Sequence, residues 1–115
     1  MMPFPGELRA KAGDPGTFTL QVEEHHPAFE GHFPNEPILS GLIQVDWAIR
    51  LGREVFACPG TFQGLEHLKF QAPIRPEEPL ELDLTWDGAA GHLSFRYSGR
   101  EGRKSQGIAV FRPVP

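Results

Sequence analysis

The stretch from residue 26 to residue 51 limits most strongly what this chain can fold into, because a proline-rich loop leads directly into the longest helical pattern of the sequence. Pro34 and Pro37 keep the loop extended, since the residue before a proline is pushed out of the helical region. Ser40 follows, and serine is a residue type that caps helices. From 41 to 56 the apolar residues recur at helical spacing around most of the circumference. We therefore predict one long, largely buried helix in this range.

Short segments in which apolar and polar residues alternate predict strands around this helix. The alternation is clearest from 17 to 23 and from 80 to 86, and further strands are expected from about 62 to 72, 93 to 97 and 104 to 112. The first fifteen residues are rich in Pro and Gly and leave room only for a short edge strand around Leu8. Four or five antiparallel strands and one buried helix predict an α+β domain whose sheet wraps the helix.

The overall composition narrows the class of protein. A chain of 115 residues fits a single domain, residues 1–115, and a long ligand would lie more easily between two copies than inside one, so we expect a dimer if there is a pocket. The net charge of −4 argues against nucleic-acid binding. We find neither a membrane-spanning apolar run nor a signal peptide, and the single cysteine fits a reducing compartment. We therefore expect a cytoplasmic protein that binds neither nucleic acid nor membrane.

Two residues of the central stretch are suited to acid–base chemistry if the fold or a dimer brings them together. A histidine such as His32, with an ordinary pKa near ~6.5, takes up a proton at neutral pH, and a carboxylic acid such as Asp46 can give one. This pair suits elimination of water from a β-hydroxy carbonyl compound. Gly41, at the start of the helix, would present a backbone N–H and the positive end of the helix dipole to the enolate oxygen.

Each of these residues also has a simpler structural explanation. Asp46 and Arg50 are four residues apart and could form an exposed helical ion pair worth ~0.3–0.5 kcal/mol. His32 could be a turn residue that bonds a backbone carbonyl, and Gly41 could be required only by the turn. On composition and periodicity alone, these structural explanations are the more common outcome.

Metal binding and cysteine chemistry are weaker interpretations. His25, His26 and His32 could bind a metal together with Asp46, but their spacing matches no paired metal motif. We therefore predict no metal site, and we expect His25 and His26 to be solvated loop residues. Cys58 is expected to be a small buried residue rather than a nucleophile, because no base lies next to it in the sequence.

The segment from 26 to 41, HPAFEGHFPNEPILSG, resembles the signature of the hot-dog-fold β-hydroxyacyl-carrier-protein dehydratases of fatty acid synthesis. Their pattern is G-H-F-P, two residues, P-[IV]-[ML]-P-G, and then an acid on the helix, which here falls on Asp46. A second segment, from 68 to 82, is similar to the family's pattern K-F-x-x-P-[VI]-x-P-G-D-x-L-x-L. From about Phe18 to Phe111, the predicted strands and helix also follow one another in the same order as in the family.

The resemblance implies a homodimer with the hot-dog architecture, in which a curved antiparallel sheet wraps a long central helix. It implies that His32 of one subunit is the base, that Asp46 of the other is the acid, and that Gly41 is the oxyanion donor. No cofactor is implied, because the acyl chain arrives as a thioester on the phosphopantetheine arm of an acyl carrier protein or on coenzyme A. Lys69 or Arg75 would meet the acidic carrier at the mouth of the pocket.

The same resemblance assigns three apolar residues to the substrate site, namely Phe33, Leu42 and Trp47. Trp47 puts a bulky side chain next to the acid, which would narrow the acyl tunnel, and Ser40 replaces the family's proline before the glycine. Aspartate at position 46 is the acid of the branch that also isomerises the double bond. The short chain looks like the small stand-alone dehydratase-like proteins of gene clusters for polyenes or other secondary lipids.

The expected function is therefore dehydration of a β-hydroxyacyl thioester to the trans-2-enoyl thioester, in fatty acid or related lipid synthesis. Two alternatives remain open on the same fold. One is a non-catalytic subunit that binds acyl thioesters, or partners an active subunit. The other is a thioesterase in which Asp46 activates water.

Overall fold

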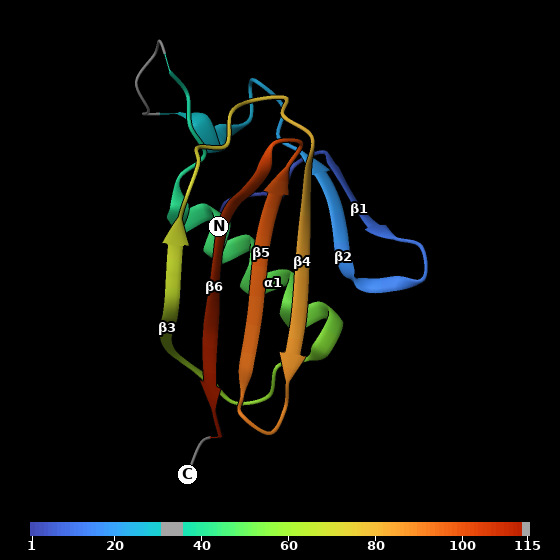
Figure 1. Ribbon diagram of the computed structural model, residues 1–115, viewed down its shortest axis with the longest axis vertical. Helices are drawn as coiled ribbons and strands as arrows, with labels where there is room; N and C mark the ends of the chain where they lie inside the picture. The colour runs from blue at the N-terminus through green and yellow to red at the C-terminus, as the bar shows by residue number, and fades with distance from the viewer. Residues whose placement is uncertain (31–35, 114–115) are drawn as a thin grey trace.

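One long helix packs against one face of a six-stranded antiparallel sheet in the computed structural model, which describes residues 1–30 and 36–113 (Figure 1). The elements are β1 (Glu7–Lys11), β2 (Asp14–Gln21), the 3-10 turn η1 (Pro27–Phe29), α1 (Gly41–Phe56), β3 (Thr61–Phe70), β4 (Leu80–Asp87), β5 (His92–Gly99) and β6 (Gly102–Arg112). The strand order is β1-β2-β4-β5-β6-β3, so β1 and β3 are the two edges. The α+β arrangement is the predicted one, with more strands than the four or five expected because the short amino-terminal strand also joins the sheet.

The helix occupies the residues that the sequence predicts. The Ser40 hydroxyl accepts a hydrogen bond from the Leu42 N–H at 3.2 Å and caps the first turn. At the other end Ala57 has a φ of 64°, which no residue inside a helix adopts, and the helix stops after Phe56. The start of the helix thus coincides with the serine cap that the sequence predicts, and its end coincides with the left-handed conformation of Ala57.

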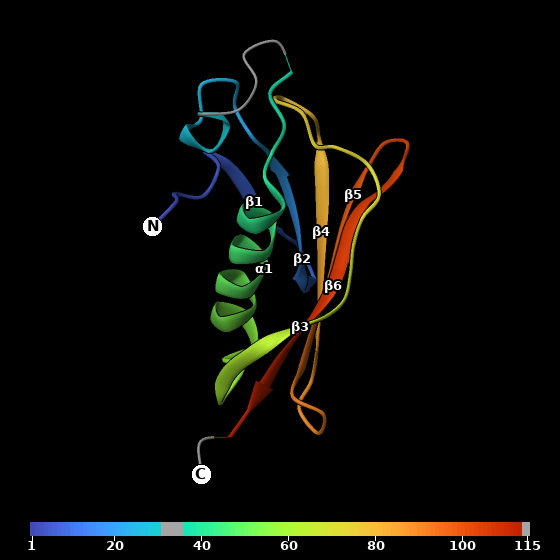
Figure 2. The same ribbon diagram turned by 90° about the vertical axis from the view of Figure 1, so that its left-hand side faces the viewer.

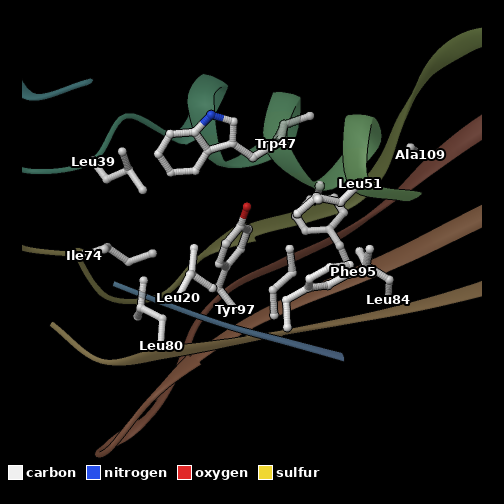
Figure 3. Packing of buried hydrophobic residues seen from close by; sticks show 14 of the residues in the cluster. Leu20, Leu39, Trp47, Leu51, Ile74, Leu80, Leu84, Phe95, Tyr97 and Ala109 are labelled. Atoms are coloured by element: carbon white, nitrogen blue, oxygen red, sulfur yellow. The ribbon is translucent and has the colours of Figure 1, made fainter. Parts of the chain in front are cut away.

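The core lies between α1 and the inner face of the sheet. Trp47 from the helix lies over Tyr97 of β5, and Leu51 lies over Phe95, one helical turn further on (Figure 3). The opposite face of the central strands is not covered by any described helix (Figure 2). The helix is thus buried on one side only, and the prediction that its apolar circumference is largely buried is wrong for Leu42, which is 81% exposed.

A buried glutamine fixes the first half of α1 on the sheet. The Gln44 side chain donates from Nε2 to the Leu39 carbonyl at 3.1 Å and accepts from the Ser105 hydroxyl of β6 at 2.5 Å. Its backbone carbonyl accepts from the Tyr97 hydroxyl at 2.7 Å. Burial, and then the negative charge of Asp46, raise the pKa of Tyr97, so this hydroxyl remains a neutral donor.

Among the described residues, no helix is long and apolar enough to span a membrane.

Replacing Gln44 by Met should lower the free energy of unfolding by about 2–3 kcal/mol, because the Leu39 carbonyl and the Ser105 hydroxyl would stay buried without partners. Urea denaturation of the two proteins measures the difference. Gln63→Met is the matched control, since Gln63 is exposed and bonds only the carbonyl of Thr61, at 3.5 Å. Equal losses in the two variants would contradict the role of Gln44.

Candidate functional site

The candidate site lies at the amino-terminal end of α1, where the loop before the helix meets the end of β3. A groove of about 330 Å³ opens there. It is lined by the segment before the helix, by the first turn of α1, by the end of β3 and by the segment that follows β3, namely Ile38, Leu39, Ser40, Gly41, Gln44, Phe70, Gln71, Ala72 and Pro73. The Leu39 N–H donates to the carbonyl of Ile74 at 2.9 Å and holds the two walls together.

Gly41 stands where the aromatic ring of Phe70 approaches the helix. A Cβ atom on Gly41 would overlap the far end of that ring. The φ of Gly41 is not in the left-handed region, so the turn itself does not require a glycine, contrary to the structural explanation that the sequence left open. In the part of the chain that the structure describes, no hydrogen bond uses the Gly41 N–H, which leaves it available to a ligand oxygen.

Asp46 pairs with Arg50 on the next turn of α1. Oδ2 of Asp46 lies 3.0 Å from a guanidinium nitrogen of Arg50. The ion pair that the sequence suggested is thus present, although it is not an ordinary surface pair, because the Arg50 side chain is only 21% exposed whereas that of Asp46 is 44% exposed. The acid therefore faces outward and its partner is largely covered.

The cover over Arg50 is the amino-terminal arm, residues 2–6. The same Arg50 nitrogen donates to the Met2 carbonyl at 2.7 Å, and the guanidinium lies 4.1 Å from the centre of the Phe4 ring. The Gly6 N–H in turn donates to the carboxylate of Glu23, at 3.2 Å. The pKa of Glu23 is held below its usual value, mainly because its carboxylate accepts a hydrogen bond from its own backbone N–H. Desolvation opposes this shift, and the hydrogen bond from the Gly6 N–H adds to it.

His26 is buried, so the prediction of a solvated loop residue is wrong for it, whereas His25 is exposed as expected. Nδ1 of His26 accepts from the Ala28 N–H at 2.9 Å, which places the proton of the neutral ring on Nε2, 3.3 Å from the Phe4 carbonyl. The ring also packs edge-on against Trp47, with centroids 5.6 Å apart. Both ring nitrogens are thus engaged by backbone groups, and His26 is not available as a metal ligand.

His32 and Phe33, the predicted base and one of the predicted substrate contacts, lie outside the described residues. The described chain ends before them at Glu30, directly after the turn η1. The approach of His32 to Asp46 stays a prediction.

The two other predicted substrate contacts occupy opposite environments. Leu42 projects from the first turn of α1 into solvent, whereas Trp47 is fully buried between His26, Phe4 and the core. Of the buried side-chain polar atoms in the described residues, the indole N–H of Trp47 alone has no hydrogen-bond partner. Within one chain, Leu42 is therefore open to a ligand or a partner chain and Trp47 is not.

Cys58 is fully buried just after the helix, as predicted. Burial raises the pKa of its thiol, and the opposing positive charge of Arg53 is the smaller influence. This environment disfavours the thiolate, which is the nucleophilic form of cysteine.

Comparison with known proteins identifies the class of this chain. A sequence model of the ApeI-like family, described as ApeI dehydratase, matches residues 9–108. The 3-hydroxyacyl-[acyl-carrier-protein] dehydratases FabZ of Erythrobacter litoralis and Syntrophobacter fumaroxidans are 38% and 32% identical over 81 and 71 residues, which are 63% and 55% of this chain. Those matches cover 53% and 48% of the relatives, so this chain spans about half the length of the curated proteins it matches.

The fold is shared with solved structures. A chain of the dehydratase heterocomplex ApeI:P from Xenorhabdus doucetiae superposes with a TM-score of 0.82 at 30% identity, over 96% of this chain and 100% of that chain. An uncharacterized protein from Erwinia carotovora gives 0.74 at 31% identity, over 98% and 95%. A thioesterase from Thermus thermophilus, at 10% identity and a TM-score of 0.64 over 91% and 89%, shares the fold alone.

The architecture and these matches together place this chain among the hot-dog-fold dehydratase families, which confirms the predicted fold class and the resemblance. Within that class, the chain belongs to the ApeI-like family.

Replacing His26 by Phe should lower the free energy of unfolding by about 1–3 kcal/mol, because the Ala28 N–H and the Phe4 carbonyl would lose their partner while the aromatic contact with Trp47 is kept. Thermal and urea denaturation measure the loss. His25→Phe, one residue earlier and exposed, is the control and should leave stability nearly unchanged. Two variants of equal stability would show that the buried hydrogen bonds of His26 do not matter.

Proposed function

We propose that this chain dehydrates a β-hydroxyacyl thioester to the trans-2-enoyl thioester in fatty acid or related lipid synthesis. The observation that carries the proposal is the match of the ApeI-like dehydratase family over residues 9–108, which includes the helix start and the acid position. The half-exposed carboxylate of Asp46 and the available N–H of Gly41 at the same end of α1 support it.

In the proposed reaction His32 takes the proton next to the thioester carbonyl. The electron pair moves onto the carbonyl oxygen, and the Gly41 N–H donates to the resulting enolate, assisted by the positive end of the helix dipole. When the enolate collapses, the carbon–oxygen bond to the β-hydroxyl breaks, and Asp46 supplies the proton with which that group leaves as water. The proton held by His32 returns to Asp46 through solvent and restores the site.

The proposed site is shared between two copies of the chain. β3 is an edge strand with no neighbour on its outer side among the described strands, and it exposes Phe62, Leu68 and Phe70. Phe70 lies against Gly41, and the exposed Leu42 is the next residue of the helix. We include Leu42 in the same proposed apolar surface. A homodimer through this surface would cover it and bring His32 of one copy to Asp46 of the other.

The proposed substrate is carried by an acyl carrier protein, or by coenzyme A. Lys69 and Arg75 flank, in sequence, the groove-lining segment from 70 to 73, and both are exposed. A second hollow of about 380 Å³ adjoins Arg75 and is lined by Arg100 and Lys104 as well as by acidic residues. Basic side chains near the groove would attract the acidic surface of a carrier protein.

The direct test incubates the purified chain with a β-hydroxyacyl carrier protein and follows loss of water by mass spectrometry. His32→Ala and Asp46→Asn should each lower kcat by at least about 100-fold, the usual contribution of a general base or acid. His25→Ala is the control, because His25 is an exposed histidine outside the groove. Full activity in both site variants would overturn the assigned roles, and release of free thiol instead of water would indicate a thioesterase.

A second candidate function is that of a non-catalytic subunit that binds acyl thioesters beside an active partner. It is supported by the structural similarity to a chain that was solved as part of a dehydratase heterocomplex. This candidate predicts that the purified chain binds a β-hydroxyacyl thioester without turnover, and that turnover appears only when a second, different subunit is added.

Leu42→Glu should weaken the proposed dimer at least about tenfold, because it places a charge in the apolar surface beside Gly41 and Phe70. Sedimentation velocity over a range of concentrations measures the change. The monomer itself should stay folded, since Leu42 is 81% exposed. Ala89→Glu, in the exposed turn between β4 and β5, introduces the same charge elsewhere and should leave the dimer intact. A wild-type chain that is monomeric would contradict the shared site.

A further inference from the structure

We infer that Arg50 is a positioning residue for the Asp46 carboxyl group and that the amino-terminal arm, residues 2–6, holds Arg50 for this purpose. The inference rests on the proposed function, in which Asp46 is the acid. It assigns a role to the Arg50 side chain and to the amino-terminal arm, neither of which belongs to the family's sequence pattern.

Arg50 has three partners, and Asp46 is only one of them. One guanidinium nitrogen donates both to Oδ2 of Asp46, at 3.0 Å, and to the carbonyl of Met2, at 2.7 Å. The flat side of the guanidinium covers the ring of Phe4, with 4.1 Å between Cζ and the ring centre. An exposed helical ion pair has none of this support and is held only loosely. The contacts from the arm therefore restrict where the Arg50 side chain can lie.

The arm is itself anchored at several points. Its Gly6 N–H binds the Glu23 carboxylate, and its Phe4 carbonyl faces Nε2 of the buried His26 at 3.3 Å. The Phe4 ring also contacts the core through Trp47, with centroids 6.5 Å apart. The arm thus touches both the helix that carries the proposed acid and the cap residue of η1, which precedes His32 in the sequence.

This arrangement leaves one oxygen of Asp46 free for chemistry. In the described part of the chain, Arg50 contacts Oδ2 and no hydrogen bond uses Oδ1. Oδ1 is thus the atom that would carry the proton and hand it to the leaving hydroxyl. When the proton leaves, Asp46 becomes a carboxylate, and the adjacent guanidinium stabilises the new charge. Arg50 therefore both orients the acid and favours the state that follows proton transfer.

Arg53 on the same helix is the natural comparison. Its guanidinium also covers an aromatic ring, that of Phe111, at 4.8 Å. Unlike Arg50 it is exposed, and it forms no ion pair among the described residues. An arginine stacked on an aromatic ring is thus present twice in α1, and only one of the two reaches the proposed acid.

The test measures kcat and KM for dehydration of a β-hydroxyacyl thioester by the full chain. Arg50→Met should lower kcat about 10–100-fold with little change in KM, because a misplaced acid slows the chemical step rather than binding. Arg50→Lys, which retains the charge, should recover part of the loss. Phe4→Leu should lower kcat in the same direction by a smaller factor, and Arg53→Met should leave it unchanged.

A double substitution separates positioning from mere structural support. In an Asp46→Asn background, Arg50→Met should cause no further loss of kcat, because the group that Arg50 positions is already absent. An equal loss in both backgrounds, or an Arg50→Met enzyme with wild-type kcat, would overturn the inference. If Asp46→Asn itself retains full activity, the proposed function fails instead, so the two failures are distinguishable.

Discussion

The placement of the candidate site depends on the buried hydrogen bonds of Gln44. An amide side chain between a helix and a sheet is tolerated only when its partners are in place, because an unpaired polar group costs more than a paired one contributes. Sliding or rotating α1 would separate Gln44 from the Leu39 carbonyl and the Ser105 hydroxyl together. The helix therefore has one acceptable register on the sheet. This register also sets the positions of Gly41, three residues before Gln44, and of Asp46, two residues after it.

Much of the fold could be predicted because its signals are local. The start of α1 at Gly41 follows from a serine cap beside a proline-rich loop, and the strands around Leu82 and Phe95 follow from simple alternation. In these segments the pattern along the chain and the burial in three dimensions coincide. One helix and several antiparallel strands then allow few arrangements other than a sheet that covers the helix.

Much of what the local pattern does not show depends on contact between segments far apart in sequence. The buried Gln44 side chain accepts a hydrogen bond from Ser105, 61 residues later, and the buried His26 ring meets the carbonyl of Phe4, 22 residues before it. Leu42 is apolar yet exposed, because the apolar residues of α1 extend around more of the helix than the part of its surface that the sheet covers. Of the candidate site, the roles of Gly41 and Asp46 stay predictions, and so does the meeting of His32 with Asp46, because His32 lies outside the described residues.

The ion pair of Asp46 was the simplest argument against a catalytic role, yet the two interpretations are compatible. An exposed pair at this spacing contributes only ~0.3–0.5 kcal/mol, too little to explain why a separate segment of the chain covers the arginine. An acid that gives up a proton in each turnover, however, becomes a carboxylate in each turnover. A guanidinium that is held from the other side by the Met2 carbonyl and the Phe4 ring meets that charge without having to move. The same contact then holds the acid in place before proton transfer and stabilises its carboxylate afterwards.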